Sequence, residues 1–181
     1  DTERRLPYHD SISLCTAPSH SLTTVAFEPD ASADTYCIDG ESVTGRGAER
    51  IKAVLDHVRE RAGIDHPVRM ESQNDFPSNV GFGSSSSGFA ALAVAAVEAA
   101  GLDYTRPEMS AIARRGSSSA ARAVTGGFSV LETGLNDQDC RAHRLDTDLG
   151  EDLRIVAALI PEYKETERAH EEAESSHMFQ A

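Results

Sequence analysis

The residues best suited to chemistry lie in one short stretch, from Pro77 to Gly88, where two glycines precede four consecutive serines. Gly81 and Gly83 let the backbone turn tightly and approach a ligand without an intervening Cβ. The serine run, Ser84–Ser87, supplies hydroxyl groups at the predicted start of a helix, where free N–H groups and the helix dipole favour an anion. The stretch therefore predicts a loop that binds a polyphosphate.

Two familiar phosphate-binding motifs do not fit this loop. Gly83 and Gly88 have the spacing of Walker A glycines, but Phe89 and Ala90 follow where Lys and then Ser or Thr are required. A dinucleotide fingerprint also fails, because Ser86 occupies the position of its third glycine. A flexible serine–glycine linker is the remaining alternative. It is disfavoured because the loop leads directly into an apolar helix.

The composition excludes several classes of protein. The 181 residues suit about one to one and a half domains, and 39% hydrophobic with 26% charged residues is typical of a soluble globular chain. Thirty acidic against 17 basic residues give a net charge of −13, which argues against nucleic-acid and anionic-membrane partners. No apolar run reaches the roughly 18 residues of a membrane span, and the start does not resemble a signal peptide.

The basic residues and the cysteines bear on the source of the chain. Only Lys52 and Lys164 are lysines, so 15 of the 17 basic residues are Arg. An acidic, lysine-poor surface without Trp stays solvated at high salt and predicts a halophilic origin, with an ordinary acidic domain as the alternative. Cys15, Cys37 and Cys140 are odd in number and widely spaced, which favours a reducing, cytoplasmic location.

The elements that precede the loop are predicted mainly as strands. β-Branched and apolar alternation indicates three strands and a hairpin around Asp39-Gly40, and helical spacing of Ile51, Val54, Leu55 and Val58 indicates a helix that ends at Gly63. The predicted strands are Ile12–Thr16, Ser21–Phe27, Tyr36–Ile38 with Ser42–Thr44, and Val68–Gln73.

The elements that follow the loop are predicted as mixed helices and strands. An alanine-rich helix closed by Gly101 comes first, and a capping box at Thr105 begins the next. The expected elements are helices Ser84–Ala100 and Thr105–Arg114, a short helix within Gly116–Val124, strands Phe128–Glu132 and Leu153–Ile160, and a charged helix from Glu165 to the end. This order favours an α+β fold over a regularly alternating α/β sheet.

Three segments carry a resemblance to a known family. Phe76–Ala91 resembles the phosphate loop of the GHMP kinase superfamily. Ala113–Arg122, followed by Gly126-Gly127-Phe128, is similar to the "RxGSxSAxR…GG" stretch of the diphosphomevalonate decarboxylase group within it. Leu6–Leu14 resembles that group's early "LPxNDSISV" strand. The three segments occur in the family's order and spacing, across roughly the first 135 residues.

The resemblance implies a fold and a domain plan. The expected fold is α+β, the N-terminal part of the GHMP kinase fold (ribosomal protein S5 domain 2-like), with a two-layer mixed sheet and helices. Residues 1–160 would form the N-terminal ATP-binding domain and residues 161–181 the start of the C-terminal domain. The family's Lys-Tyr-x-Gly-Lys segment would precede Asp1, its catalytic Asp would follow Ala181, and a homodimer is possible.

The resemblance also implies an activity and its residues. The family uses ATP to phosphorylate the 3-hydroxyl of a phosphorylated mevalonate, and loss of phosphate and CO₂ then gives an isopentenyl phosphate or diphosphate. Arg122 would hold the substrate carboxylate, beside Ser117 and Ser119 in the substrate pocket, and Arg122 and Ser85 would be catalytic. Ser84 would also contact Mg²⁺, and the nucleotide-binding residues would be Gly81, Gly83, Ser84, Ser85, Ser86, Ser87 and Gly88.

Some alternatives remain open on the sequence. Without the resemblance, Arg122 would be read as a surface residue and Ser117–Ser119 as a helix N-cap cluster. Where diphosphate-using relatives carry a Ser/Arg/Gly/Met-rich turn, this chain has the acidic segment Glu162–Arg168, which favours 5-phosphomevalonate over 5-diphosphomevalonate as the small-molecule substrate. A mevalonate 3-kinase without decarboxylation and a non-catalytic nucleotide-binding domain are the other hypotheses.

Overall fold

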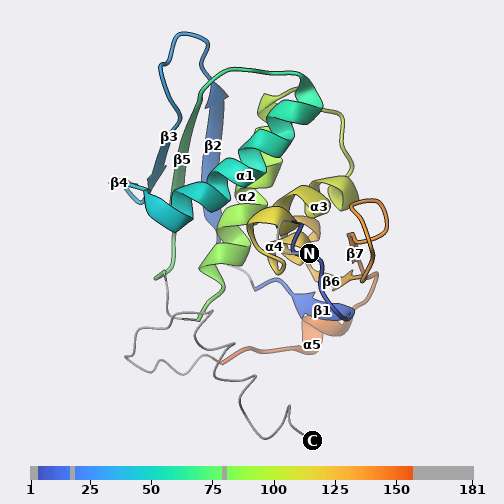
Figure 1. Ribbon diagram of the computed structural model, residues 1–181. Coiled ribbons are helices and arrows are strands. Elements are labelled where there is room, and N and C mark those ends of the chain that lie inside the picture. The colour runs from blue at the N-terminus through green and yellow to red at the C-terminus, as the bar shows by residue number, and fades with distance from the viewer. Residues whose placement is uncertain (1–3, 17–18, 79–80, 157–181) are drawn as a thin grey trace, which may run out of the picture.

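Two β-sheets and the helices between them form an α+β structure in the computed structural model, which describes residues 4–16, 19–78 and 81–156 (Figure 1). In chain order the elements are β1 (Ser11–Leu14), β2 (Ser21–Phe27), β3 (Thr35–Ile38), β4 (Glu41–Ser42), α1 (Gly45–Ala62), β5 (Val68–Asn74), α2 (Ser84–Ala99), α3 (Arg106–Gly116), α4 (Ala120–Thr125), β6 (Phe128–Leu131), β7 (Ala142–Arg144) and α5 (Leu149–Asp152).

The larger sheet is mixed and has the strand order β2-β5-β3-β4. β2 and β5 are antiparallel from the pair Ser21–Asn74 to the pair Phe27–Val68, whereas β3 and β5 are parallel. The parallel pairing requires a crossover, which α1 supplies. The turn between β3 and β4 contains Asp39 and Gly40, both with positive φ, as a tight hairpin turn requires.

The smaller sheet is antiparallel and has the order β1-β6-β7. It joins the beginning of the described chain to a segment more than 110 residues later, through pairs such as Ser11–Leu131 and Leu14–Phe128. Leu131 and Ser129 are fully buried against the helices, while Ile12 on β1 is 65% exposed. The sheet therefore has one packed face, and α4 lies between this sheet and α2 (Figure 1).

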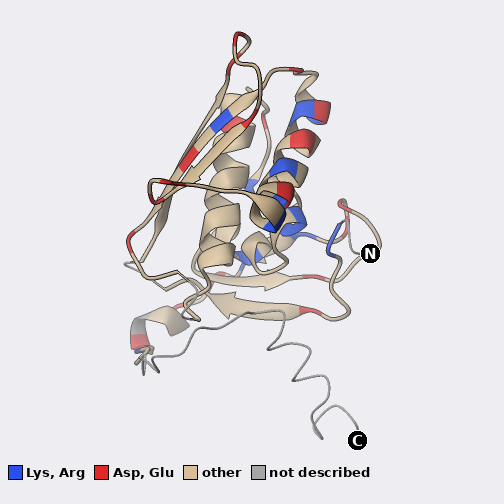
Figure 2. Ribbon diagram, turned by 60° about the vertical axis from the view of Figure 1, so that its left-hand side comes forward, with Lys and Arg blue, Asp and Glu red and all other residues tan. Residues whose placement is uncertain are grey.

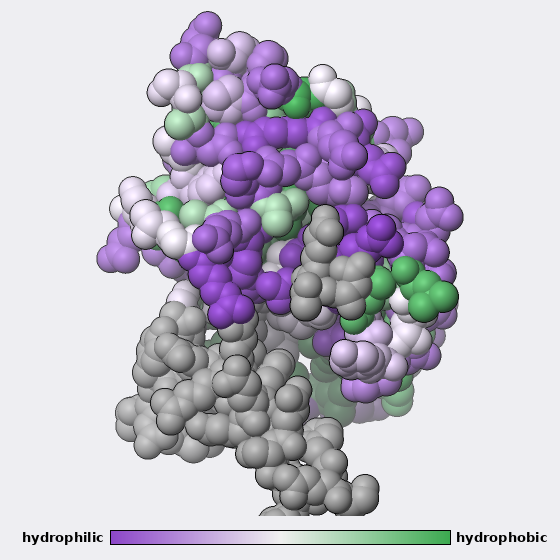
Figure 3. Space-filling view, viewed as in Figure 1, coloured by the Kyte–Doolittle hydropathy of each residue, from purple (hydrophilic) through white to green (hydrophobic). Residues whose placement is uncertain are grey.

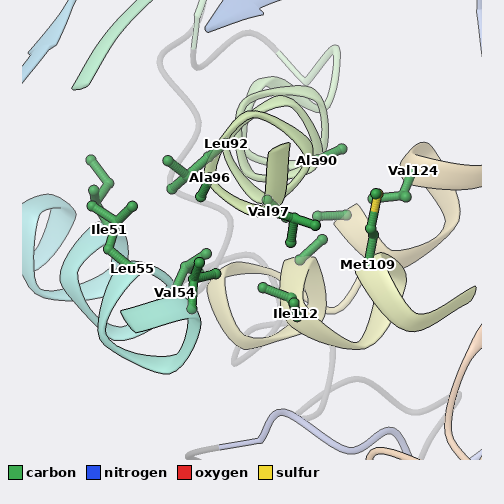
Figure 4. Close-up of a cluster of buried hydrophobic side chains, with 14 of the residues drawn as sticks. Ile51, Val54, Leu55, Ala90, Leu92, Ala96, Val97, Met109, Ile112 and Val124 are labelled. Atoms are coloured by element: carbon green, nitrogen blue, oxygen red, sulfur yellow. The ribbon is translucent and has the colours of Figure 1, made fainter. Parts of the chain in front are cut away.

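The main core lies where α1, α2 and α3 meet the larger sheet. Ile51, Val54 and Leu55 of α1 point toward Leu92 and Val97 of α2 (Figure 4). Small alanines on α2 let the neighbouring helices approach closely, and each fully buried Val or Leu contributes about 1.5–3 kcal/mol. The main core therefore fixes α2, the helix that follows the glycine–serine loop.

The outer surface is strongly polar on the face that α1 presents to solvent. Acidic and basic residues alternate along the outer side of α1 (Figure 2), and hydrophilic residues cover most of the described surface around it (Figure 3). None of the described helices is long and apolar enough to cross a membrane.

Most predicted elements are confirmed, and their ends follow the expected signals. Gly63 and Gly101 have φ values of 65° and 67° just after α1 and α2, and the Thr105 N–H donates to Glu108 Oε2 at 2.8 Å at the start of α3. The α+β fold class is confirmed as well. The predicted strand Ser42–Thr44 is shifted. β4 covers Glu41 and Ser42, whereas Thr44 is the residue that precedes α1.

Two predictions near the end of the described chain need correction. β7 was not predicted, because its three residues Ala142–Arg144 form a strand only by pairing with β6. Residues 153–156, the beginning of the predicted strand Leu153–Ile160, have no regular secondary structure. The rest of that strand, the charged helix from Glu165 and the boundary between residues 160 and 161 lie outside the described residues.

Candidate nucleotide and substrate site

The glycine–serine loop takes the conformation that its glycines permit. Gly81 and Gly83 have φ values of 90° and 76°, and a Cβ at Gly81 would meet nothing within 4 Å, so this glycine is needed for its backbone angle rather than for space. The carbonyl of Gly83 accepts from the amides of Ser86 and Ser87 at 2.8 and 3.1 Å.

The amides of the first two helical residues remain available for a ligand. Ser84 and Ser85 begin α2, and no acceptor for their N–H groups is found in the described part of the chain. Because the first turn of a helix has no internal acceptors and lies at the positive end of its dipole, these amides favour an anion. The 16 residues of α2 make this a full helix dipole.

The first turn of α2 divides the four serines between two cavities. The larger one, which we call the α2–α4 cavity, has a volume of about 780 Å³ and is lined by Gly81, Gly83, Ser86 and Ser87 together with residues of β1, β2 and α4. The smaller one, the α1–α2 cavity, has a volume of about 360 Å³ and is lined by Ser84, Ser85 and Gly88 together with Arg50, Met70 and Phe89.

Arg122 of α4 lies in the α2–α4 cavity with the loop. Its Nη1 donates to Ser11 Oγ, and its buried Nε has no hydrogen-bond partner among the residues that the structure describes. Among the described acidic residues none forms an ion pair with it. Burial lowers the pKa of Arg122 below its ordinary value, but an Arg side chain stays charged at neutral pH. A partly buried cation with no acidic partner in the described part of the chain therefore lines this cavity.

The predicted substrate-pocket serines hold different positions. Ser119 lines the α2–α4 cavity, and its Oγ hydrogen-bonds to Ser86 Oγ of the loop. Ser117 lines neither cavity, but its Oγ lies 3.1 Å from the Oγ of Ser119. Although Ser119 immediately precedes α4, its side chain makes no N-cap hydrogen bond. The Ser119–Ser86 contact thus joins the segment before Arg122 to the loop.

Ser87 is held by a chain of hydrogen bonds that runs through Ser21 and Asn74 to Asp39. Ser21 Oγ lies 2.8 Å from Ser87 Oγ and 2.6 Å from Asn74 Oδ1, while Asn74 Nδ2 donates to Asp39 Oδ2 at 3.1 Å. The Ser21 hydroxyl is the donor toward both Ser87 Oγ and Asn74 Oδ1, and the amide oxygen of Asn74 can only accept. These bonds attach Ser87, in the first turn of α2, to β2 and β5 of the larger sheet.

A second group of charged residues supports the segment that carries Arg122. Arg114 is fully buried and donates to Asp137 Oδ1 at 2.5 Å and to the carbonyl of Arg4 at 2.5 Å, and Arg115 donates to Asp137 Oδ2 at 2.5 Å. Burial raises the pKa of Asp137, but the hydrogen bonds and charges of Arg115 and Arg114 outweigh it and lower the pKa overall. No local pattern in the sequence links Asp137 to α3, so its role could not be predicted from the sequence.

The donors present fit a magnesium ion that is held mainly through phosphate. Within the described residues, no group of three or more His, Cys, Asp or Glu side chains is placed to bind a metal. Mg²⁺ keeps several water ligands and usually needs few protein oxygens when it bridges phosphates. The hydroxyls of the loop serines beside the free amides of α2 meet that requirement, with Ser84 on the side of the α1–α2 cavity.

The structure therefore brings Ser119 and Arg122 into one cavity with Gly81, Gly83, Ser86 and Ser87, and it places Ser84, Ser85 and Gly88 in the neighbouring one. Their roles toward ligands remain predictions. The arrangement can bind an anionic chain at the start of α2 and a second anion at Arg122.

The fold first identifies the class of protein. A solved structure of mevalonate diphosphate decarboxylase from Enterococcus faecalis matches with a TM-score of 0.76 at 35% identity, over 81% of this chain and 46% of that one. The enzyme from Staphylococcus aureus matches with a TM-score of 0.79 at 33% identity, over 89% and 51%. The chain therefore has the α+β fold of these decarboxylases, which is of the GHMP kinase type.

The sequence comparison then gives the family. The profile of the diphosphomevalonate decarboxylase-like N-terminal domain matches residues 1–142, and the chain belongs to this family. The phosphomevalonate decarboxylase of Haloferax volcanii is 71% identical over 181 residues, which is all of this chain and 56% of that protein. The diphosphomevalonate decarboxylase of Eremothecium gossypii is 30% identical over 88% of this chain and 44% of its own length. The chain thus spans about half the length of these relatives.

One further solved structure bears on ligands. MDDEF in complex with MVAPP, AMPPCP and magnesium matches with a TM-score of 0.76 at 35% identity, over 81% of this chain and 45% of that one. That relative thus holds MVAPP, AMPPCP and magnesium in one complex.

Proposed function

We propose that the full-length protein is an ATP-dependent decarboxylase that acts on a phosphorylated mevalonate. The observation that carries the proposal is the guanidinium of Arg122, which has no acidic partner among the described residues and shares a cavity with the glycine–serine loop. A polyphosphate-binding helix start and a cation for a carboxylate are the two functions that this reaction requires of one site. The names of the relatives in both comparisons support the same reaction.

The residues divide the chemistry between the two anion sites. The amides of Ser84 and Ser85 bind the polyphosphate of ATP, which supplies the phosphoryl group that turns the 3-hydroxyl of the substrate into a good leaving group. Arg122 binds the C1 carboxylate through its planar guanidinium and so orients the C1–C2 bond. As that bond breaks and CO₂ leaves, its electron pair forms the C2–C3 double bond and the C3–O bond breaks to release phosphate.

The α1–α2 cavity is the proposed place of the nucleoside. It adjoins Ser84 and Ser85, and Ile51, Met70 and Phe89 give it apolar walls for a flat base. Mg²⁺ would be held by phosphate oxygens and loop hydroxyls. The acidic, lysine-poor composition and the 71% identical Haloferax relative together support a halophilic source.

For the substrate, we propose 5-phosphomevalonate. The relative that shares 71% identity over this whole chain is a phosphomevalonate decarboxylase, whereas relatives named for the diphosphate share about 30%. The acidic segment Glu162–Arg168, which motivated the same expectation from the sequence, lies outside the described residues.

The test follows ADP and CO₂ together, with ATP and either phosphorylated mevalonate supplied to the full-length protein. We expect equal amounts of both products and faster turnover of the monophosphate. ADP without CO₂ would show a kinase, and neither product would show a binding domain. Faster turnover of the diphosphate would contradict the proposed substrate.

A variant tests the role of Arg122. Arg122→Ala should lower decarboxylation by at least about 100-fold, since loss of substrate orientation has effects of that size. ATP binding, measured by calorimetry, should change by less than about threefold. Arg61→Ala, which removes an exposed Arg of α1 outside both cavities, is the matched control and should retain full activity. Loss of ATP binding in Arg122→Ala would instead place Arg122 at the nucleotide.

A further inference from the structure

Arg50 of α1 reaches two other helices with one side chain. Its guanidinium lies over the ring of Phe89 in α2, 4.7 Å from the ring centroid. Its Nε and Nη2 donate to the carbonyl of Gly116, the last residue of α3, at 3.0 and 2.6 Å. Both Arg50 and Phe89 also line the α1–α2 cavity. Arg50, in the wall of the α1–α2 cavity, thus binds the C-terminal end of α3, and the chain continues from there to residues that line the α2–α4 cavity.

The bond to Gly116 has a clear physical reason. The last carbonyls of a helix have no donor within it, and a cation at this end is favoured by the helix dipole. Two hydrogen bonds from one planar guanidinium fix the direction of the carbonyl as well as its distance. Arg50 therefore determines where the chain leaves α3.

Phe89 and Gly116 fit against each other without free space. A Cβ at Gly116 would lie 2.0 Å from Cδ1 of Phe89 and 2.4 Å from its Cγ, so only glycine allows this approach. The Phe89 ring thus lies directly against the backbone of Gly116 and under the guanidinium of Arg50. The three groups are therefore in direct contact with one another.

The segment held in this way leads directly to the proposed substrate contacts. Ser119 and Arg122 follow Gly116 by three and six residues, and Ser119 is bonded to Ser86 at the start of α2. The segment from Gly116 to Arg122 is therefore attached to α2 at two points. The attachment through Phe89 faces the α1–α2 cavity, and that through Ser86 faces the α2–α4 cavity.

We propose that Arg50 is a positioning residue that couples the two cavities. A ligand that packs against Arg50 and Phe89 in the α1–α2 cavity favours one position of Gly116, and through the short segment that follows it favours the position of Arg122 that binds a carboxylate. The coupling must be reciprocal, so each ligand strengthens the binding of the other by the same factor. The inference rests on the proposed function, which assigns a nucleoside to one cavity and a carboxylate to the other.

The test measures this factor by calorimetry on the full-length protein, after ATP-dependent CO₂ release has been shown for the wild type. The dissociation constant of 5-phosphomevalonate is determined with and without AMPPCP and magnesium, and that of AMPPCP with and without 5-phosphomevalonate. For the wild type we expect each ligand to strengthen the other at least about fivefold, within the usual range of such coupling.

Arg50→Lys is the decisive variant, because Lys keeps the charge but cannot give two fixed bonds to one carbonyl. We expect its coupling factor to fall below about twofold, whatever the lost contact with Arg50 does to the binding of AMPPCP alone. Arg61→Lys, the same change on the exposed side of α1, should keep the wild-type factor. Arg50→Ala should behave like Arg50→Lys where it folds, and Arg50→Lys carries the test where it does not.

The outcomes separate the inference from the function. Weaker binding of both ligands and a lower melting temperature in Arg50→Lys, with the coupling factor unchanged, would overturn the positioning role and leave a purely structural one. An active wild type without coupling would overturn it too. A wild type that neither binds the ligands nor releases CO₂ would refute the proposed function itself, and the coupling with it.

Discussion

The two sheets of the molecule are held to their helices in different ways. Around the larger sheet, α1 and α2 bury a continuous apolar core that includes Val54, Leu55 and Val97. Around the smaller sheet, the separate buried cluster consists of Leu131 and three small residues, Ala121, Cys140 and Ala142. There the fully buried Arg114, with Arg115, is bound to Asp137 instead.

This difference shows which region depends on directional hydrogen bonds and which depends on the area of apolar surface that is buried. Apolar burial is not directional and tolerates small adjustments, whereas charge-assisted hydrogen bonds fix position and are costly to break. The segment with Ser119 and Arg122 depends on both kinds of contact, because Ala120 and Val124 belong to the main apolar core while Ser119 and Arg122 are bonded to Ser86 and Ser11. The direction of a side chain that must orient a substrate is thus set by polar contacts, and the position of its helix by the apolar core.

Among the substitutions that test this difference, removal of Asp137 should cause the largest loss of stability. Asp137→Ala leaves the buried guanidinium of Arg114 without its carboxylate, and loss of one partner from such a pair costs about 3–5 kcal/mol. The free energy of unfolding of the full-length protein, measured by urea denaturation, should fall by that amount. Decarboxylation should fall as well, because the end of α3 loses its support.

The matched control is Asp65→Ala, which removes the same charge from an exposed loop position. Its unfolding free energy should stay within about 0.5 kcal/mol of the wild type. If Asp137→Ala is as stable as this control, the Arg114–Asp137 pair does not hold the region, and the contrast between the two sheets fails.

A methyl group at Gly116 should have the next largest effect. Its Cβ would lie 2.0 Å from the Phe89 ring, which Arg50 covers on its face, so the helices must separate at about 1–3 kcal/mol. Gly150→Ala is the control, because its Cβ would make only an ordinary 3.8 Å contact with Phe128. The free energies of unfolding of the two variants, measured by thermal denaturation, should differ by this amount.

A second substitution shows whether the clash is the cause. Phe89→Val removes the ring, so adding it to Gly116→Ala should cost less than the sum of the two single variants. Additive costs would mean that Gly116 is required for another reason.

The sequence predicts the region around the larger sheet better than the region around the smaller one, and the contrast above explains why. Strand Ser21–Phe27 and helix α1 follow from periodicity and from Gly63, because local spacing determines which face is buried. The bonds of Asp137 to α3 join residues more than 20 positions apart and leave no periodic pattern. The pairing of β7 with β6 is equally non-local.

The candidate site shows the same division. The loop from Gly81 to Gly88 is recognisable because a helix start needs a particular local sequence. The sequence does not show how the residues of this loop are divided between the two cavities, because that depends on how α2 is rotated against α1 and α4. The role of Arg50 was equally hidden, since it depends on a stacking contact with a residue 39 positions later.

The smallest expected effect concerns pH at the boundary of the two regions. His57 of α1 has a side chain only 12% exposed, and burial, with the charges of Arg115 and Arg61, lowers its pKa to about 4, although Asp137 and Glu60 act in the opposite direction. An unfolded His has a pKa near 6.5, so between these values the unfolded chain binds a proton that the folded chain does not. Stability should therefore fall as the pH decreases from 7 to 5, by about 1–2 kcal/mol from this residue.

Urea denaturation of His57→Gln at both pH values tests the assignment, because Gln is polar but cannot take up a proton. The variant should lose about 1–2 kcal/mol less than the wild type between pH 7 and 5. His66→Gln, at an exposed position after α1, should leave the wild-type difference unchanged. Since the charges of both Arg115 and Asp137 act on His57, its protonation is sensed where the apolar core meets the charged network. An equal loss of stability in His57→Gln and in the wild type would show that protonation of His57 does not cause the pH dependence.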